Sequence, residues 1–155
     1  MSALNHFRLL RADARTEIHD ITLDSRAAGE GSLFLALHGA REDGADYAEE
    51  ALARGAACVV TEHAVEGVPC VLVPDAHEAA ARLAARWCGE PAERMTVVGV
   101  TGTNGKTTTT YLLKQLLERC LGVKVGLIGT NQNMIGNAVL PAEHTTPDAL
   151  TLQRL

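Results

Sequence analysis

The sequence predicts an α/β protein in two parts, a small α/β domain over residues 1–88 and the start of a parallel-sheet domain over residues 89–155. Two observations lead to this prediction. Short runs rich in Val, Ile and Leu alternate with longer stretches rich in Ala, Leu and Glu, which is the pattern of strands alternating with helices. A glycine-rich segment at residues 101–108 also stands between an apolar run and a helical pattern, as in a unit whose helix connects two parallel strands.

The first part contains four predicted strands and two predicted helices. The strands are short apolar runs bounded by turn-forming residues, at residues 18–23, 33–37, 57–61 and 68–73. The first helix, over residues 47–54, follows Asp46 as an N-cap and ends at Gly55. The second, over residues 77–87, is Ala-rich and follows Asp75, whose carboxylate can accept from the first backbone N–H groups of the helix. Together these elements form a small α/β unit.

The second part begins near residues 89–94, where Gly89 and Pro91 end the preceding helix. A buried-strand pattern at residues 95–100 leads into the glycine-rich loop, a helix over residues 107–121 and a strand over residues 123–128. That order predicts a βαβ unit with parallel strands and a right-handed crossover. The helix carries a wide apolar face that we expect to lie on the sheet, formed by Leu112, Leu113, Leu116, Leu117 and Cys120.

Composition and charge exclude several classes of function. The net charge is −5, the pI is near 5.6 and no run of Lys or Arg exists, so the basic surface of a nucleic-acid-binding protein is missing. No apolar run approaches the roughly 20 residues of a membrane-spanning helix, and residues 1–10 lack the pattern of a signal peptide. The four cysteines form no C-x-x-C pair, which favours reduced cysteines in a cytoplasmic protein, and the six histidines lack the spacing of a metal site.

The glycine-rich loop predicts a nucleotide-binding site. Gly102 and Gly105 allow positive φ angles, so that consecutive backbone N–H groups can point at one phosphate. The following helix adds its positive dipole end at the same place. Lys106 can neutralise phosphate oxygens, and the Thr107 hydroxyl can ligate Mg²⁺. The predicted ATP-binding residues are Gly102, Thr103, Asn104, Gly105, Lys106, Thr107 and Thr108, with Lys106 as the catalytic cation and Thr107 as the metal ligand.

The loop departs from the standard phosphate-loop pattern at one position. The pattern has a glycine five positions before Gly105, where this chain has Val100, and Gly99 is displaced by one residue. The competing interpretation is a glycine turn that joins a strand to a helix beside an exposed lysine. The flanking strand and helix patterns and the Lys-Thr pair favour nucleotide binding over that interpretation.

Three segments resemble the Mur ligase family. Gly102-Thr-Asn-Gly-Lys-Thr-Thr108, preceded by Val97-Val-Gly-Val-Thr101, is similar to the family's ATP loop. Thr22-Leu-Asp-Ser-Arg26, followed by residues 31–37 and by Asp43-Gly44, resembles the family's uridine-nucleotide domain. Thr145-Thr-Pro-Asp148 is similar to the branch that adds the third residue of the peptidoglycan peptide. The resemblance implies a UDP-muramoyl-substrate-binding domain at residues 1–88 and the first part of a central, parallel-sheet P-loop ATPase domain at residues 89–155.

The resemblance implies an ATP-dependent amide ligase of peptidoglycan synthesis that uses ATP and Mg²⁺. Its implied substrates are UDP-N-acetylmuramoyl-L-alanyl-D-glutamate, whose D-glutamate carboxylate becomes an acyl phosphate, and a diamino acid, either meso-diaminopimelate or L-lysine. A cytoplasmic monomer without nucleic-acid or membrane partners is expected. Two alternatives stay open, the related ligase that adds D-alanyl-D-alanine and a non-catalytic nucleotide-binding module. No residues here match the family's carboxylated lysine or amino-acid domain, so we expect an incomplete portion that is inactive by itself.

Carried over residue by residue, the resemblance also implies contacts with the UDP-muramoyl substrate. These contacts are Leu23 and Ser25, the loop Ala40, Arg41 and Glu42 near the uracil, and His144, Thr145 and Thr146. His144 stands where the family often has Asn, and Arg26 beside Ser25 can reach a phosphate. Local roles compete with these contacts. Asp24-Ser25 can simply close a turn, while Thr146 as N-cap and Pro147 as first residue can open a further helix.

Overall fold

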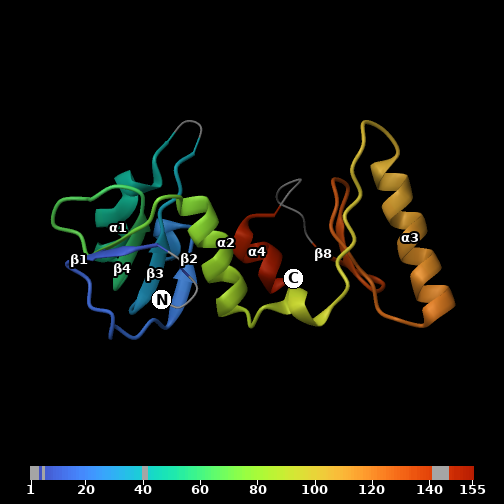
Figure 1. The fold of residues 1–155 in the computed structure, drawn as a ribbon, viewed down its shortest axis with the longest axis horizontal. Helices are drawn as coiled ribbons and strands as arrows, with labels where there is room; N and C mark the ends of the chain where they lie inside the picture. The colour runs from blue at the N-terminus through green and yellow to red at the C-terminus, as the bar shows by residue number, and fades with distance from the viewer. Residues whose placement is uncertain (1–3, 5, 40–41, 141–146) are drawn as a thin grey trace. The chain divides into compact units, whose positions relative to one another are not determined.

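The computed structural model describes residues 4, 6–39, 42–140 and 147–155 and divides the chain into two compact units (Figure 1). The first unit consists of Met1–Pro91 together with Ala149–Leu155, and the second of Ala92–Asp148. The sequence-based division placed residues 89–155 together, whereas the last seven residues pack with the first unit. The architecture is mixed α/β with a parallel sheet, which confirms the predicted fold class.

A five-stranded sheet forms the centre of the first unit. Its order is β1-β5-β4-β3-β2, in which the four neighbours β2 to β5 run parallel and β1 pairs antiparallel with β5 at the edge. The strands are β1 Arg8–Leu10, β2 Asp20–Thr22, β3 Ser32–Leu35, β4 Cys58–Thr61 and β5 Cys70–Leu72. The four predicted strands are confirmed with shorter bounds, and β1 is an additional strand that the sequence analysis missed.

Helices cover both faces of this sheet because successive strand residues point to opposite sides. Leu33 and Leu35 of β3 belong to a core cluster that includes alanines of α2 (Ala76–Trp87), whereas Phe34 lies in a second cluster with alanines of α1 (Ala48–Ala53). Figure 1 shows α1 on one side of the sheet and α2 on the other. The sheet is therefore buried on both faces, as parallel sheets usually are.

Of the two predicted N-caps, the one of α2 agrees with the structure and the one of α1 does not. The Asp75 side chain accepts from the backbone N–H of Glu78 at 2.8 Å, which confirms it as the N-cap of α2. The prediction that Asp46 caps the first helix is wrong, because Asp46 lies inside a 3-10 turn, Gly44–Tyr47, that precedes α1. Asp43 caps that turn instead, by accepting from the backbone N–H of Ala45 at 2.9 Å.

The last helix, α4 (Ala149–Arg154), is part of the first unit (Figure 1). Its Leu150 is buried in the same core cluster as the α2 alanines, and Arg154 Nη2 lies 3.2 Å from Asp20 Oδ1 on β2. A helix was expected to open at Pro147 with Thr146 as its N-cap. The helix begins two residues later, and Thr146 lies outside the described residues.

The second unit contains a long helix and three short strands. The helix α3 spans Lys106–Leu121 and confirms the helix predicted over residues 107–121. The strands β6 Gly126–Leu127, β7 Asn133–Ile135 and β8 Ala138–Leu140 form an antiparallel sheet in that order. The predicted parallel βαβ unit is therefore wrong for this structure. β6 pairs with the strand that follows it closely in sequence, which closes a much shorter loop than a crossover does.

Two further predictions for the second unit differ from the structure, one of them in part. Residues 95–100 form no strand in the described chain, and the Val97 side chain is 70% exposed. The apolar face predicted on α3 is only partly covered, because Leu112, Leu116 and Cys120 are exposed while Leu113 and Leu117 are half-buried, and α3 contacts β6 of the antiparallel sheet. Lys114, expected among the polar positions, is instead buried and lies 2.7 Å from the Glu118 carboxylate. Parallel sheets are usually covered by helices on both faces, and the described residues of the second unit form only a short antiparallel sheet, which leaves part of α3 uncovered.

Candidate functional site

The glycine-rich loop and the first turn of α3 form one candidate site. Gly105 has φ +79° and serves as the N-cap of α3, and Gly102 has φ +145°. Both values lie in the region that residues with a Cβ rarely adopt, so glycine is required for this loop shape. Gly105 has no side chain with which to cap the helix, and the N–H groups of the first turn are thus left for an anion at the helix start.

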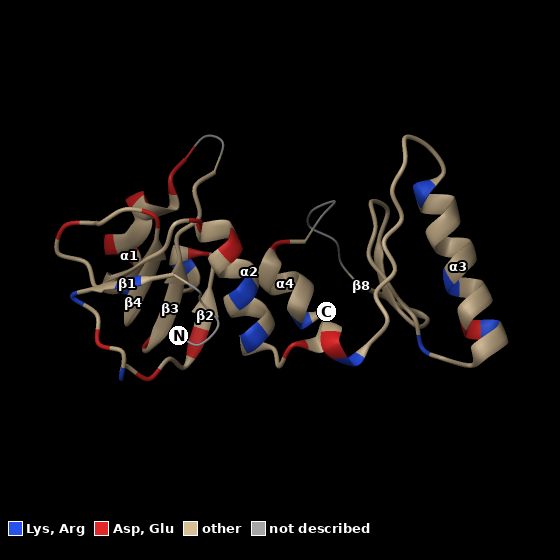
Figure 2. Ribbon diagram, viewed as in Figure 1, with Lys and Arg blue, Asp and Glu red and all other residues tan. Residues whose placement is uncertain are grey.

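Lys106 is the only charged residue between Arg94 and Lys114 and stands at the start of α3 (Figure 2). Its Nζ donates hydrogen bonds to the carbonyl oxygens of Gly102 and Thr103, the latter at 3.4 Å. The ammonium group therefore folds back over the loop. Thr107 and Thr108 follow it in the first turn, and all of residues 101–108 are exposed. The segment therefore combines one cation with the free backbone donors of the first turn of α3.

A metal ion at this site would depend mainly on ligands other than the side chains that the structure describes. Within the described parts of the chain, no three His, Cys, Asp or Glu side chains are grouped to hold a metal. Mg²⁺ keeps several waters and binds phosphates through few protein oxygens, so the exposed Thr107 hydroxyl beside Lys106 fits that requirement.

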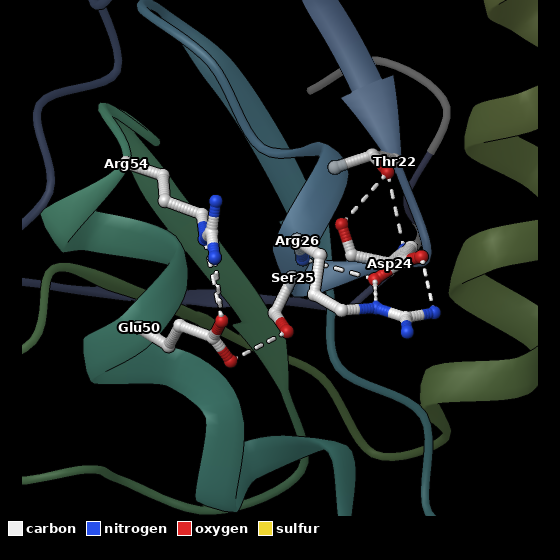
Figure 3. A network of polar contacts seen from close by, with 6 residues as sticks. All are labelled: Thr22, Asp24, Ser25, Arg26, Glu50 and Arg54. Atoms are coloured by element: carbon white, nitrogen blue, oxygen red, sulfur yellow. Dashed lines mark hydrogen bonds and ion pairs between the residues drawn. The ribbon is translucent and has the colours of Figure 1, made fainter.

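The second group of predicted residues surrounds a 3-10 turn, Ser25–Ala27, after β2 (Figure 3). The buried Ser25 hydroxyl donates to Glu50 Oε2 on α1 at 3.0 Å. Arg54 donates to Glu50 Oε1 through Nε at 3.2 Å and Nη2 at 3.1 Å. Glu50 and Arg54 were not among the predicted site residues. Only the fold reveals this contact, because Glu50 is 25 residues away from Ser25 in the sequence.

Asp24 and Arg26 pair with each other beside Ser25 (Figure 3). Asp24 accepts three hydrogen bonds from Arg26, at 2.9 Å each, from the backbone N, Nε and Nη2. These bonds and the guanidinium charge lower the pKa of the Asp24 carboxyl and raise the pKa of Arg26. The expected turn-closing role of Asp24 is present, since it caps the 3-10 turn. Arg26, which we expected to reach a phosphate, is bound to Asp24.

The remaining predicted substrate contacts lie in different surroundings. Leu23 is partly buried against the core cluster on the α2 side of the sheet. Glu42 is exposed and accepts from the Tyr47 hydroxyl at 2.8 Å, an interaction that raises the pKa of Tyr47. The other five predicted residues, Ala40, Arg41, His144, Thr145 and Thr146, lie outside the described residues.

A small open cavity of about 260 Å³ lies where β3 and β4 end. His38 Nδ1 and His63 Nε2 lie 3.4 and 3.8 Å from Asp43 Oδ2 in this cavity, so two histidines that the sequence analysis set aside share one carboxylate. The backbone N–H of Ala45, followed by His38, lowers the pKa of Asp43. Both histidines follow the carboxyl ends of parallel strands, where ligands often bind, and this position in the chain was the available signal.

Two family models match this sequence, and together they include both groups of candidate site residues. Residues 17–88 match the model described as the Mur ligase family, catalytic domain, and residues 100–155 match the Mur ligase middle domain. The chain belongs to the Mur ligase family. The second match includes the segment that forms α4, which packs with the first unit in this structure.

Two curated relatives of this Mur ligase chain carry the same name. The protein of Caldanaerobacter subterraneus subsp. tengcongensis is 45% identical over 94% of this chain, and that of Geobacillus kaustophilus is 48% identical over 89%. Both are named UDP-N-acetylmuramoyl-L-alanyl-D-glutamate--2,6-diaminopimelate ligase. The chain spans only 31% and 28% of their respective lengths.

Solved structures of Mur ligases are also similar to this chain. A UDP-N-acetylmuramoyl-L-alanyl-D-glutamate--2,6-diaminopimelate ligase has TM-score 0.68 and 31% identity over 88% of this chain and 28% of its own. The MurF ligase from Thermotoga maritima, solved in complex with ADP, has TM-score 0.50 and 37% identity over 67% of this chain and 24% of its own. Within the described residues, no helix of this Mur ligase chain has the length and apolar character needed to cross a membrane.

Proposed function

We propose that this chain binds ATP and UDP-N-acetylmuramoyl-L-alanyl-D-glutamate as part of a cytoplasmic ligase that adds diaminopimelate to the D-glutamate residue. The observation that carries the proposal is the loop at the start of α3, where Gly102 and Gly105 have positive φ and Lys106 is the only charged residue in the sequence between Arg94 and Lys114. The shared name of the curated relatives supports this choice of substrates. The diaminopimelate ligase structure covers 88% of this chain, compared with 67% for the ADP-bound MurF ligase.

The proposed reaction has two steps. A carboxylate oxygen of D-glutamate attacks the γ-phosphorus of ATP, which forms an acyl phosphate and releases ADP. The amine of diaminopimelate then attacks the acyl carbon, loses a proton and displaces inorganic phosphate. In the first step, negative charge on the transferring group is stabilised by fixed donors, the largest effect that a site of this kind supplies. Residues of the first unit would hold the uridine nucleotide, with Ser25 as the principal candidate.

Lys106 has to exchange its hydrogen-bond partners when a nucleotide binds. Its Nζ now donates to the carbonyl oxygens of Gly102 and Thr103, and phosphate oxygens would replace these neutral acceptors. Hydrogen bonds to charged groups are each worth about 1.5–3 kcal/mol, which corresponds to roughly 10- to 150-fold in affinity. Mg²⁺ would add charge neutralisation on the phosphates, with the Thr107 hydroxyl as its ligand from this loop.

Titration of the chain with a non-hydrolysable ATP analogue tests the nucleotide site. We expect Lys106→Ala to weaken binding at least tenfold, because the loop loses its only cation. Lys124→Ala is the matched control, since Lys124 is an exposed lysine of the same unit outside the loop. Binding that is equally strong in wild type and Lys106→Ala would remove Lys106 from the site, and equal losses in both variants would indicate a general charge effect.

A further inference from the structure

The side chains of Ser25 and Glu50 have one hydrogen-bond proton between them, and it is already donated within the pair (Figure 3). A serine hydroxyl has one proton, and that of Ser25 is donated to Glu50 Oε2 at 3.0 Å. An ionised carboxylate only accepts hydrogen bonds, and Arg54 donates twice to the other oxygen of Glu50. The pair therefore offers lone pairs to a ligand and has no proton left to donate.

The pair is reached by solvent mainly from the Glu50 side. Ser25 is 7% exposed, whereas the Glu50 side chain is 40% exposed. Arg54 fixes the Glu50 carboxylate from one side and Ser25 from the other, which holds its remaining lone pairs in a defined direction. A carboxylate has about four lone-pair sites, so it can accept a further hydrogen bond from a ligand while both protein donors stay in place.

We propose that Glu50 is a positioning and specificity-determining residue of the uridine-nucleotide site, where it makes the Ser25–Glu50 pair a receptor for an N–H or O–H donor. In uridine the donors are the imide N–H of the base and the ribose hydroxyls. This inference rests on the proposed function, because it assumes that the first unit binds the uridine nucleotide. The pair is expected to bind the nucleoside and not the diphosphate. Phosphate oxygens at neutral pH are negatively charged acceptors, so a carboxylate repels them.

The neighbouring charges agree with this assignment. Arg26 is the cation closest in sequence to Ser25, and it donates three hydrogen bonds to Asp24. The guanidinium of Arg54 is likewise bound to Glu50. Both arginines are thus paired with carboxylates around the turn after β2. A diphosphate would have to bind the remaining N–H groups of these arginines beside the carboxylate of Asp24 or Glu50, whereas a hydroxyl or imide donor can bind the Glu50 carboxylate directly.

Binding of uridine 5′-monophosphate to the 155-residue chain tests the proposal by calorimetry. We expect Glu50→Gln to weaken binding about tenfold, because a charged acceptor is replaced by a neutral amide that can itself donate to Ser25. Affinity for the ATP analogue should not change. Glu49→Gln is the matched control, since Glu49 is the exposed neighbour on the same helix, and it should leave both affinities unchanged.

Analogues of uridine 5′-monophosphate that lack one hydrogen-bond donor identify the group that donates to the Ser25–Glu50 pair. The N3-methyl base analogue removes the imide donor, and the 2′-deoxy analogue removes one hydroxyl. We expect one of them to bind wild type about tenfold more weakly than uridine 5′-monophosphate, and this difference should disappear in Glu50→Gln. A purely structural role of Glu50 would lower affinity for all three ligands equally. Ser25→Ala combined with Glu50→Gln should be less than additive, because both changes disrupt one pair.

The outcomes separate this inference from the proposed function. Wild type that fails to bind the uridine nucleotide would overturn both. Wild type that binds it, with Glu50→Gln equally strong, would overturn the role of Glu50 and leave the proposed function standing. Inorganic phosphate that competes in wild type but not in Glu50→Gln would show that the pair reads phosphate. Arg54→Met provides a second variant in which Ser25 and Glu50 stay in place, and a several-fold weaker affinity is expected there as well.

Discussion

The two units of the chain differ in how far their apolar side chains are exposed to solvent. In the first unit, Leu35 of β3 is 1% exposed and Val59 of β4 is fully buried, because four parallel strands and the helices on both faces enclose them. In the second unit, Val97 is 70% exposed and Leu112 on α3 is 62% exposed. Both units have sequences in which apolar runs alternate with helical patterns. The difference is that the first unit forms four neighbouring parallel strands, whereas the described residues of the second unit form a short antiparallel sheet.

This contrast separates local from long-range determinants of structure. The glycine-rich loop and α3 form in the second unit because Gly105 at one end and Gly122 at the other, with φ +79° and +64°, supply their own backbone geometry. A parallel sheet has no such local origin, since each strand needs partners brought in by a crossover. The proposed nucleotide site lies in the unit with the exposed apolar residues, and the proposed uridine site in the unit with the buried core.

The largest test of the contrast compares two leucines. Leu35→Ala should lower the free energy of unfolding of the first unit by about 2–5 kcal/mol, because it leaves a cavity in a fully packed core. Leu112→Ala removes the same atoms from an exposed helix position and should change stability by no more than about 0.5 kcal/mol. Urea unfolding followed by the fluorescence of Trp87, the single tryptophan, reports on the first unit. Circular dichroism follows the helices of both units, so a loss of helical signal that does not coincide with the change in Trp87 fluorescence reports on α3.

A large loss of stability in Leu112→Ala would contradict the contrast. It would mean that the exposed face of α3 is covered in solution, for example by a second copy of the chain. Sedimentation of wild type and Leu112→Ala at several protein concentrations distinguishes this explanation, because an association through α3 would weaken in the variant.

The same contrast explains how much of the fold followed from the sequence. The four predicted strands of the first unit and its two predicted helices are present because each apolar run there pairs with a neighbouring strand of the sheet. The strand predicted at residues 95–100 has an equally strong pattern but no partner, and it stays irregular and exposed. The edge strand β1 was missed because Arg8 interrupts its apolar pattern, and its partner strand β5 lies 60 or more residues away in the sequence.

The candidate sites divide in a similar way. A contiguous segment defines the glycine-rich loop, so its position before α3 could be predicted from spacing alone. The pair of Ser25 with Glu50 and the cavity with His38, Asp43 and His63 join residues from separate elements. Neither could be inferred from spacing, since each depends on which strands are neighbours in the sheet. The binding roles of these residues stay predictions.

A smaller effect is expected when the backbone geometry of the loop is changed. An alanine at position 105 meets no neighbouring atom within 4 Å, so the whole cost of Gly105→Ala is the left-handed conformation, about 1–2 kcal/mol. The exposed loop can relax in the free chain, and binding then has to restore the strained shape. We expect the ATP analogue to bind roughly 5- to 30-fold more weakly.

Gly99→Ala is the control for this loop variant. Position 99 is equally free of neighbours and does not have the positive φ of Gly105, so its variant should bind the analogue as wild type does. Equal affinities of wild type and Gly105→Ala would show that the left-handed start of α3 is not the nucleotide-binding shape of the loop.

The smallest expected effect concerns the reactivity of the cysteines, because the first unit contains a buried cysteine and the second an exposed one. Burial, with a minor contribution from nearby Cys70, raises the pKa of the Cys58 thiol from 9.0 to about 11, whereas Cys120 on α3 is exposed. Because only the thiolate is nucleophilic, iodoacetamide at pH 8.5 should alkylate Cys120 rapidly and Cys58 hardly at all. Between about pH 9 and 11 the unfolded chain ionises Cys58 while the folded chain keeps its proton, so stability should fall as pH rises through that range. Peptide mapping by mass spectrometry measures both rates, with urea-unfolded chain as the reference for full reactivity. Alkylation of Cys58 at the rate of Cys120 in the native chain would mean that β4 opens as readily as the exposed surface of α3, and the two units would then not differ in the way the buried and exposed leucines indicate.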